Sequence, residues 1–364
     1  MAKRKTSRSS DQEDAATPAG DAASHAAATA DPPPRALVWC DPGQGDLLAL
    51  TLRRARVETA LVASPRGGAA REIASGLGAE PADDLRQAVL AEGIGLIVLA
   101  SVASPDAAEL LPAEAPGELA PVVVSFSPWP DSLIALRGDR GTRAWPVRFA
   151  PVMRRSPGWK ATSEVLDAFA PASILGLSFR AAQRHATLAA RLCDAMDIAL
   201  LTLGEPETID ARVRGPRSRA GLHLAPGDSL PDLRGALSAH LRYADGRSAA
   251  VTIADNAGHW FRGVTLLGEN GCLRIDDAGF EWIDPEGRVV DSARRAETDA
   301  AAKGDDALAA ILAAEIRGAI ESPHEAPALG DVKTTLAMAE AATLSARTGQ
   351  PESPATIMRM TGAL

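Results

Sequence analysis

RALVWCDPGQGDLLALTLRRARVETALVASPR, residues 35–66, is the stretch of this sequence that decides its fold. Its first apolar run, Ala36–Cys40, has the length of a buried strand, and a Pro/Gly turn follows at Asp41–Gly45. Leucines at 47, 48, 50 and 52, followed by arginines at 53, 54 and 56, predict an amphipathic helix with cations in its last turn, where the helix dipole favours them. A second apolar run, Val57–Ala63, completes the strand–turn–helix–strand unit that begins a dinucleotide-binding sheet.

The turn departs from the pattern G-x-G-x-x-G, in which glycines let the backbone approach a pyrophosphate. If Gly45 is the last glycine of that pattern, Cys40 and Pro42 stand at the two earlier positions. If Gly43 and Gly45 are the first pair, Leu48 stands at the third. Proline has no N–H to offer a phosphate. If a nucleotide binds, we expect Gly43 and Gly45 to lie against it.

The end of the second strand carries Ser64 and Arg66, and no acidic residue for the ribose hydroxyls of NAD. An arginine can pair with a 2′-phosphate, so this pair favours NADP over NAD. The alternative is that both are solvated loop residues. The sequence therefore leaves open whether the chain binds NADP or NAD.

Composition limits the class of protein. The chain has 364 residues, enough for two domains, and its 46% hydrophobic and 23% charged content is that of a globular protein. A formal net charge of −9 argues against nucleic acid and acidic membranes as partners. Three widely spaced cysteines form neither a disulfide framework nor a metal-ligand spacing, which favours the cytoplasm and no metal.

We predict three segments. Residues 1–34 are basic and then Ala/Pro-rich, which predicts a disordered tail. Residues 35–150 continue the alternation of strands and helices, with strands near 94–100, 122–125 and 145–149, and predict a Rossmann-like, doubly wound parallel sheet. Residues 151–364 predict an α+β domain with a large open, mainly antiparallel sheet, and we expect its last helix, about 332–347, to pack back toward the first domain.

Four phrases in this order resemble the glucose–fructose oxidoreductase / inositol dehydrogenase / MocA (Gfo/Idh/MocA) family. They are VETALVASPRGGAAREIASGLGAEPADDLRQAVLAEGIGLIVLAS, LCDAMDIALLTLGEPETIDARV, GVTLLGENGCLRID and DVKTTLAMAEAATLSARTGQP. The resemblance implies a Rossmann domain, a second domain whose open sheet mediates homo-oligomers, and hydride transfer between NAD(P) and a hydroxyl of a sugar or cyclitol.

The family's catalytic groups are replaced at the matching positions. Its Glu-Lys-Pro motif aligns with Phe126, Ser127 and Pro128, so a serine stands in the place of the proton-donating lysine. Its Asp and His, four residues apart, align with Ala190 and Asp194. A further family aspartate aligns with Asp197.

The residues present offer another route to the same chemistry. Asp194 and Asp197 lie at i and i+3 on one helix face, so one of them can serve as a base. Lys160 or His185 can then supply the acid. The alternative is that both aspartates are solvated or salt-bridged and that His185 is a loop residue without a chemical role.

Two functions therefore stay open. The first is an NAD(P)-dependent oxidoreductase acting on CH–OH groups with a rebuilt active site. The second is a non-catalytic ligand-binding, scaffold or regulatory protein that keeps the fold. In either case we expect a small polyol or sugar-like ligand.

Overall fold

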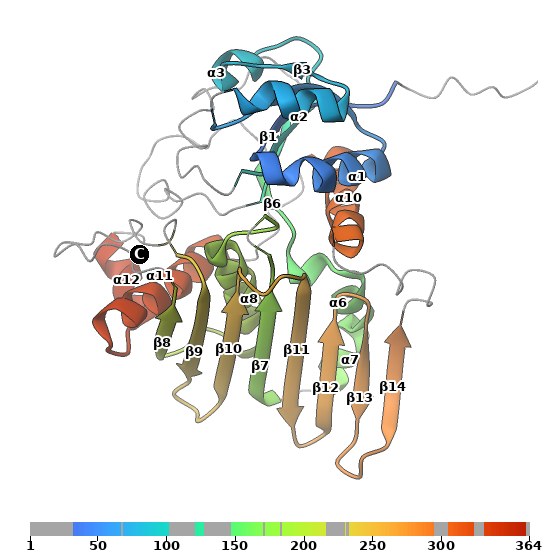
Figure 1. Cartoon of the computed structure of the whole chain (residues 1–364). Coiled ribbons are helices and arrows are strands. Elements are labelled where there is room, and N and C mark those ends of the chain that lie inside the picture. The colour runs from blue at the N-terminus through green and yellow to red at the C-terminus, as the bar shows by residue number, and fades with distance from the viewer. Residues whose placement is uncertain are drawn as a thin grey trace, which may run out of the picture. The chain divides into compact units, whose positions relative to one another are not determined.

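The computed structural model describes residues 32–66, 68–101, 121–126, 147–169, 172–182, 184–215, 230, 233–294, 305–323 and 331–361 (Figure 1). The predicted tail lies outside the described residues except for its last three positions. The same is true of Ser127. Among the helices that are described, none is both long and apolar enough to cross a membrane.

The first half of the chain forms a six-stranded sheet in the order β3-β2-β1-β4-β5-β6, and every pairing in it is parallel. Its strands are β1 (Arg35–Trp39), β2 (Glu58–Ala63), β3 (Glu80–Pro81), β4 (Leu96–Leu99), β5 (Val122–Ser125) and β6 (Val147–Phe149). This is the strand order of dinucleotide-binding folds, and it confirms the predicted Rossmann-like sheet. The order reverses between β1 and β4, so their carboxyl ends flank the place where such folds bind ligands.

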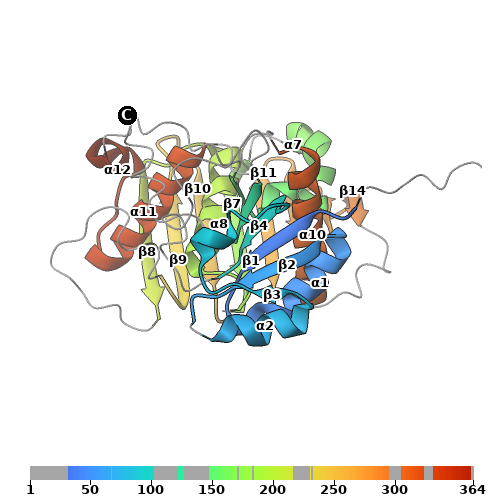
Figure 2. The ribbon, with the colours of Figure 1, turned by 90° about the horizontal axis from the view of Figure 1, so that it is seen from above.

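Helices cover both faces of this sheet. Apolar residues of α1 (Gly45–Ala55) and α2 (Ala69–Leu77) pack with Ala36 and Val38 of β1, whereas α3 (Leu85–Ala88) packs against Leu37 on the opposite face. Figure 2 shows α1 and α2 running along the strands. The first helix ends at Arg56, whose left-handed φ of 58° lets its N–H bond to the carbonyl of Arg53.

The second half forms an eight-stranded sheet in the order β14-β13-β12-β11-β7-β10-β9-β8. Its strands are β7 (Ala172–Arg180), β8 (Thr208–Arg214), β9 (Ala236–Arg242), β10 (Ser248–Ala254), β11 (Phe261–Gly268), β12 (Gly271–Asp276), β13 (Gly279–Ile283) and β14 (Val289–Arg294). All pairings except β7 with β10 are antiparallel, which confirms the predicted mainly antiparallel sheet.

The described helices of this half lie on one face of the sheet, except for the helix Asp305–Glu321, which packs against α1 (Figure 1). They are α6 (Pro157–Ala161), α7 (Ser163–Phe169), α8 (Leu188–Leu203), α10 (Asp305–Glu321), α11 (Val332–Thr348) and α12 (Pro354–Thr361). The chain turns between α6 and α7 at Thr162, whose hydroxyl donates to the carbonyl of Trp159 over 2.7 Å. Alternate residues of β9 and β10 are buried under the helices, and the others are exposed or half-buried.

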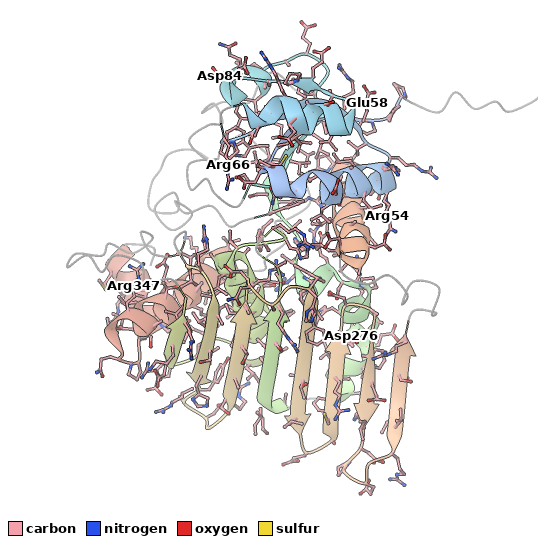
Figure 3. The ribbon with its side chains drawn as sticks, viewed as in Figure 1. Arg54, Glu58, Arg66, Asp84, Asp276 and Arg347 are labelled. Carbon is pink, nitrogen blue, oxygen red and sulfur yellow. The ribbon has the colours of Figure 1, made fainter. Side chains whose placement is uncertain are left out.

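The helix that packs against the parallel domain is α10, whereas the sequence prediction gave this role to the helix near 332–347. Helix α11 instead packs mainly on β8, α8 and α12. Arg54, at the end of α1, donates to Asp306 of α10 over 2.6 Å, and Arg317 of α10 donates back to the carbonyl of Arg54 (Figure 3). These bonds join residues 252 and 263 positions apart, so a local sequence pattern does not predict them.

Candidate functional site

The carboxyl ends of β1 and β4 are joined by a hydrogen bond across the point where the strand order reverses. The Oγ of Ser101 donates to the Oδ2 of Asp41 over 2.9 Å, and both side chains are buried. Asp41 also lies 3.7 Å from the Nε of Arg66, which follows β2. The Asp41 carboxylate therefore lies close to the carboxyl ends of β1, β2 and β4.

Gln44 closes the same turn from the other side. It lies in η1, the 3-10 turn Pro42–Gln44, and its side-chain oxygen accepts from the backbone N–H of Asp41 over 2.9 Å. Its amide nitrogen donates to the carbonyl of Ala100 over 2.7 Å and to that of Arg184 over 3.1 Å. One buried amide thus ties β1, β4 and the loop before α8 together.

The predicted cofactor residues surround this turn. Gly43 lies within η1 and Gly45 is the first residue of α1. A Cβ on Gly43 would meet nothing within 4 Å, and one on Gly45 would make only an ordinary 3.7 Å contact with Ile73. Ser64 accepts a 3.3 Å bond from the N–H of Arg66, whose side chain lies near the start of α1 and is 69% exposed (Figure 3).

These residues do not fit a dinucleotide pyrophosphate. Phosphate sites at helix N-termini rely on free N–H groups and positive potential. Here Pro42 has no N–H, and the Asp41 carboxylate carries negative charge. The oxygen and the nitrogen of the Gln44 side-chain amide both form hydrogen bonds within the protein. A nucleotide phosphate entering this turn would have to displace the bond between Asp41 and Ser101.

Asp194 lies at the position that the sequence alignment gave to the family's histidine, and three donors of the protein itself bind its carboxylate. It is completely buried on α8. Its Oδ1 accepts from the N–H of Met153 over 2.6 Å, and its Oδ2 accepts from Arg191 and from Arg262, each over 3.0 Å. Two guanidinium groups and one N–H thus surround this buried carboxylate with charge-assisted hydrogen bonds.

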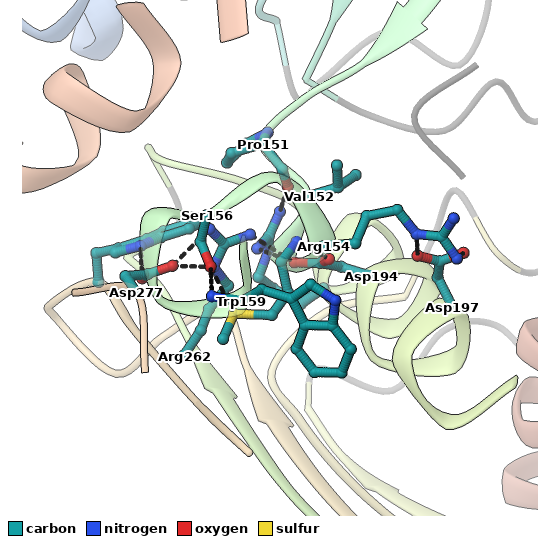
Figure 4. A network of polar contacts seen from close by, with 12 residues as sticks. Pro151, Val152, Arg154, Ser156, Trp159, Asp194, Asp197, Arg262 and Asp277 are labelled. Carbon is teal, nitrogen blue, oxygen red and sulfur yellow. Dashed lines mark hydrogen bonds and ion pairs between the residues drawn. The ribbon is translucent and has the colours of Figure 1, made fainter. Parts of the chain in front are cut away.

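The two arginines extend this network to β11 and to the turn after β12 (Figure 4). Arg262 also donates to Asp277 over 2.8 and 2.6 Å, and Trp260 donates to the other oxygen of Asp277 over 2.9 Å. Arg191 stacks over the Trp260 ring at 4.4 Å and donates to the carbonyl of Pro151. Burial lowers the pKa of Arg191 to about 10, against the opposing effect of Asp194, so both guanidinium groups stay charged at neutral pH.

Asp197 is also completely buried, and it holds Arg154 through two parallel bonds of 2.6 and 2.9 Å (Figure 4). Arg154 belongs to η2, the 3-10 turn Met153–Arg155 that follows β6. The next residue, Arg155, lies 3.5 Å from Glu315 of α10. Burial raises the pKa of Glu315 to about 7 even though Arg155 acts to lower it.

His185, the proposed acid, is bound at both ring nitrogens. Its Nδ1 accepts from the N–H of Ala182 over 3.3 Å, so Nε2 carries the proton of the neutral ring and donates to Asp305 over 2.7 Å. Burial lowers its pKa despite Asp305. Lys160 is exposed on α6. Of the residues proposed for catalysis, the structure thus brings together Asp194 and Asp197 alone among those that it describes.

Several residues of this site were not foreseen from the sequence. Arg154 is 43 positions from Asp197 and Arg262 is 68 positions from Asp194, so no local sequence pattern predicts these pairs. Arg191 could have been found, because an arginine within the apolar helix 188–203 needs a carboxylate and Asp194 lies three residues on. Among the described residues, no group of His, Cys, Asp and Glu side chains could hold a metal ion.

Comparison with known proteins places this arrangement in a class. No protein-family model matches the sequence, and a search of curated proteins finds no match. Solved structures do match: a putative myo-inositol dehydrogenase from Sinorhizobium meliloti has 16% identity and a TM-score of 0.56 over 87% of this chain and 99% of that one. An oxidoreductase from Agrobacterium radiobacter in complex with NAD+, L-tartaric acid and magnesium has 15% identity and a TM-score of 0.62 over 90% and 99%.

Levoglucosan dehydrogenase in complex with NADH and levoglucosan gives a similar result, with 13% identity and a TM-score of 0.62 over 87% of this chain and 98% of that one. The chain therefore has the fold of these sugar and cyclitol dehydrogenases, a parallel sheet followed by a large, mainly antiparallel one. The resemblance to the Gfo/Idh/MocA family is confirmed at the level of the fold.

Proposed function

We propose that this chain is a non-catalytic ligand-binding protein that keeps the fold of a sugar or cyclitol dehydrogenase. The observation that carries the proposal is the hydrogen bond between Ser101 and Asp41, because it occupies the turn that a cofactor pyrophosphate needs. The position aligned with the catalytic histidine supports it. There Asp194 is completely buried and is bound by two arginines and a backbone N–H, which leaves it poorly placed to act as a base on a substrate.

A second candidate is an NADP-dependent oxidoreductase of the same fold. Two observations favour it: the open space next to Gly43, and the exposed guanidinium of Arg66, which can pair with a 2′-phosphate. The solved structures with NAD or NADH bound favour it by analogy. In this case the turn at Asp41 rearranges on binding, and Asp194 and Asp197 keep their structural pairs while other groups move the proton.

Titration of the purified protein with NADH and NADPH separates the two candidates. A ligand at about 100 times its Kd stabilises the folded state by about 2.7 kcal/mol, which raises Tm by several degrees. We expect neither nucleotide to change Tm, and no rise in absorbance at 340 nm when NAD+ or NADP+ is mixed with the protein and myo-inositol or levoglucosan. A saturable rise in Tm with either nucleotide would establish the second candidate instead.

We also propose that the uncovered face of the large sheet binds a second copy of the chain. Ile174 on β7 and Leu267 on β11 are paired across the strands and are 47% and 39% exposed. Beside them the face carries small residues such as Gly176 and Ala250, so a second sheet can approach it closely. Exposed apolar side chains that touch one another on a flat face favour association over isolated exposure.

A further inference from the structure

Arg154 and Arg155 are consecutive, partly exposed arginines, each bound from its buried side by a carboxylate of a different helix. The Arg154 side chain is 23% exposed and is held by Asp197 of α8. The Arg155 side chain is 20% exposed and is held by Glu315 of α10. Both arginines lie on η2, where the chain passes from the parallel sheet to the second domain.

The Asp197 carboxylate occupies one edge of the Arg154 guanidinium. It accepts from Nε and from Nη2, and it is itself completely buried. The other edge consists of Nη1 and the second N–H of Nη2. Nη1 forms no bond to any residue in the part of the chain that the structure describes. Asp197 already holds the guanidinium in place at one edge. A ligand that binds the other edge therefore costs little further side-chain conformational entropy.

The Arg154 fork belongs to a network of charged side chains. Arginines and carboxylates alternate through the network, and the groups are Arg154, Arg155, Arg191, Arg262, Asp194, Asp197, Asp277 and Glu315. Three of the carboxylates are held by bonds of 3.0 Å or less, whereas Glu315 is 3.5 Å from both of its partners.

We propose that Arg154 binds the carboxylate of a small organic acid through its outer edge, with Asp197 as the residue that positions it. A carboxylate is favoured over phosphate because its two coplanar oxygens match the single remaining edge and it brings one negative charge. The inference names the ligand class for the ligand-binding protein proposed above and rests on that proposal.

The test is calorimetric titration with D-gluconate, L-tartrate, inorganic phosphate and myo-inositol, each at about 1 mM, where even weak binding is measurable. We expect at least one of the two acids to bind and myo-inositol to show no heat. Arg154→Lys keeps the charge beside Asp197 but loses the fork, so affinity for the acid falls at least about tenfold. Arg288→Lys, which alters an exposed arginine that is likewise paired with an aspartate, is the matched control and leaves binding unchanged.

Arg154→Met combined with Asp197→Asn removes both charges together and guards against loss of folding. This pair must keep the far-UV circular dichroism of the natural protein and lose acid binding. The inference is overturned if neither acid binds, if phosphate binds in place of both acids, or if Arg154→Lys binds the acid unchanged. Turnover with NADPH, together with acid binding that depends on Arg154, would refute the non-catalytic proposal and leave this inference standing.

Discussion

Ser101 donates a hydrogen bond to Asp41 over 2.9 Å, and this bond joins the ends of β1 and β4 at the point where the strand order of the parallel sheet reverses. In dinucleotide-binding folds that point is left to the ligand. Here a buried carboxylate fills it, and Arg66 approaches the other oxygen of the same carboxylate at 3.7 Å. A carboxylate of the protein thus lies at the point where other proteins with dinucleotide-binding folds bind their ligand.

Replacement of this anion is the direct test of that substitution. In the variant Asp41→Ser, Pro42→Gly, the turn loses its negative charge and gains a backbone N–H, so we expect NADPH to raise Tm where it has no effect on the natural protein. Asp46→Ser, which removes an exposed carboxylate from the first turn of the same helix, is the control and gains nothing. If the folded double variant shows no rise in Tm with NADPH, the Asp41 carboxylate is not what prevents nucleotide binding.

The sequence predicts most of this fold, because strand and helix periodicity are local. The run from Ala36 to Ala63 was enough to anticipate β1, α1 and β2. The bond from Ser101 to Asp41 could also have been anticipated, since each residue follows a buried strand and these strands are neighbours in the order 3-2-1-4. The partners of Asp194 could not, because Arg262 comes from β11 and the N–H of Met153 from a turn in a different part of the chain.

Asp194 should contribute strongly to the stability of the folded protein. In Asp194→Ala, two buried guanidinium groups lose their shared carboxylate, and breaking a buried pair in this way costs about 3–5 kcal/mol. At about 2–4 °C per kcal/mol, calorimetry should find Tm lower by roughly 6–20 °C. Asp210→Ala removes the carboxylate of a surface pair with Arg212 and should change the free energy of unfolding by less than about 1 kcal/mol. Equal effects of the two variants would contradict the buried network.

Glu315 should make stability depend on pH. Burial raises its pKa in the folded protein to about 7, from an ordinary value of 4.5, against the charges of Arg155 and Arg262 and with that of Asp194. The folded state thus binds the proton more tightly than the unfolded state. The resulting stability is fully present below pH 4.5 and is lost as the pH rises through 7.

In Glu315→Gln the side chain is neutral at every pH. We therefore expect the variant to exceed the natural protein in free energy of unfolding by up to about 3 kcal/mol at pH 8, with the difference vanishing toward pH 4.5. Urea titrations at pH 5 and pH 8 measure both values. Glu321→Gln, at the exposed end of the same helix, should show no such pH-dependent difference. A constant difference at the two pH values would mean that Glu315 is ionised throughout this range.

The uncovered sheet face gives the last prediction. If a second copy docks there, a carboxylate placed between two packed sheets is buried without a partner and opposes association strongly. Ile174→Asp, whose side chain lies beside Leu267 on that face, should therefore convert the dimer to a monomer in light scattering after gel filtration, while its circular dichroism stays unchanged. Leu201→Asp introduces the same charge at a leucine of α8 that is 50% exposed, away from the sheet face, and should remain dimeric. A concentration of about 50 µM is well above the Kd of a stable dimer. If the natural protein is a monomer at that concentration, the proposal that this sheet face forms a dimer interface is wrong.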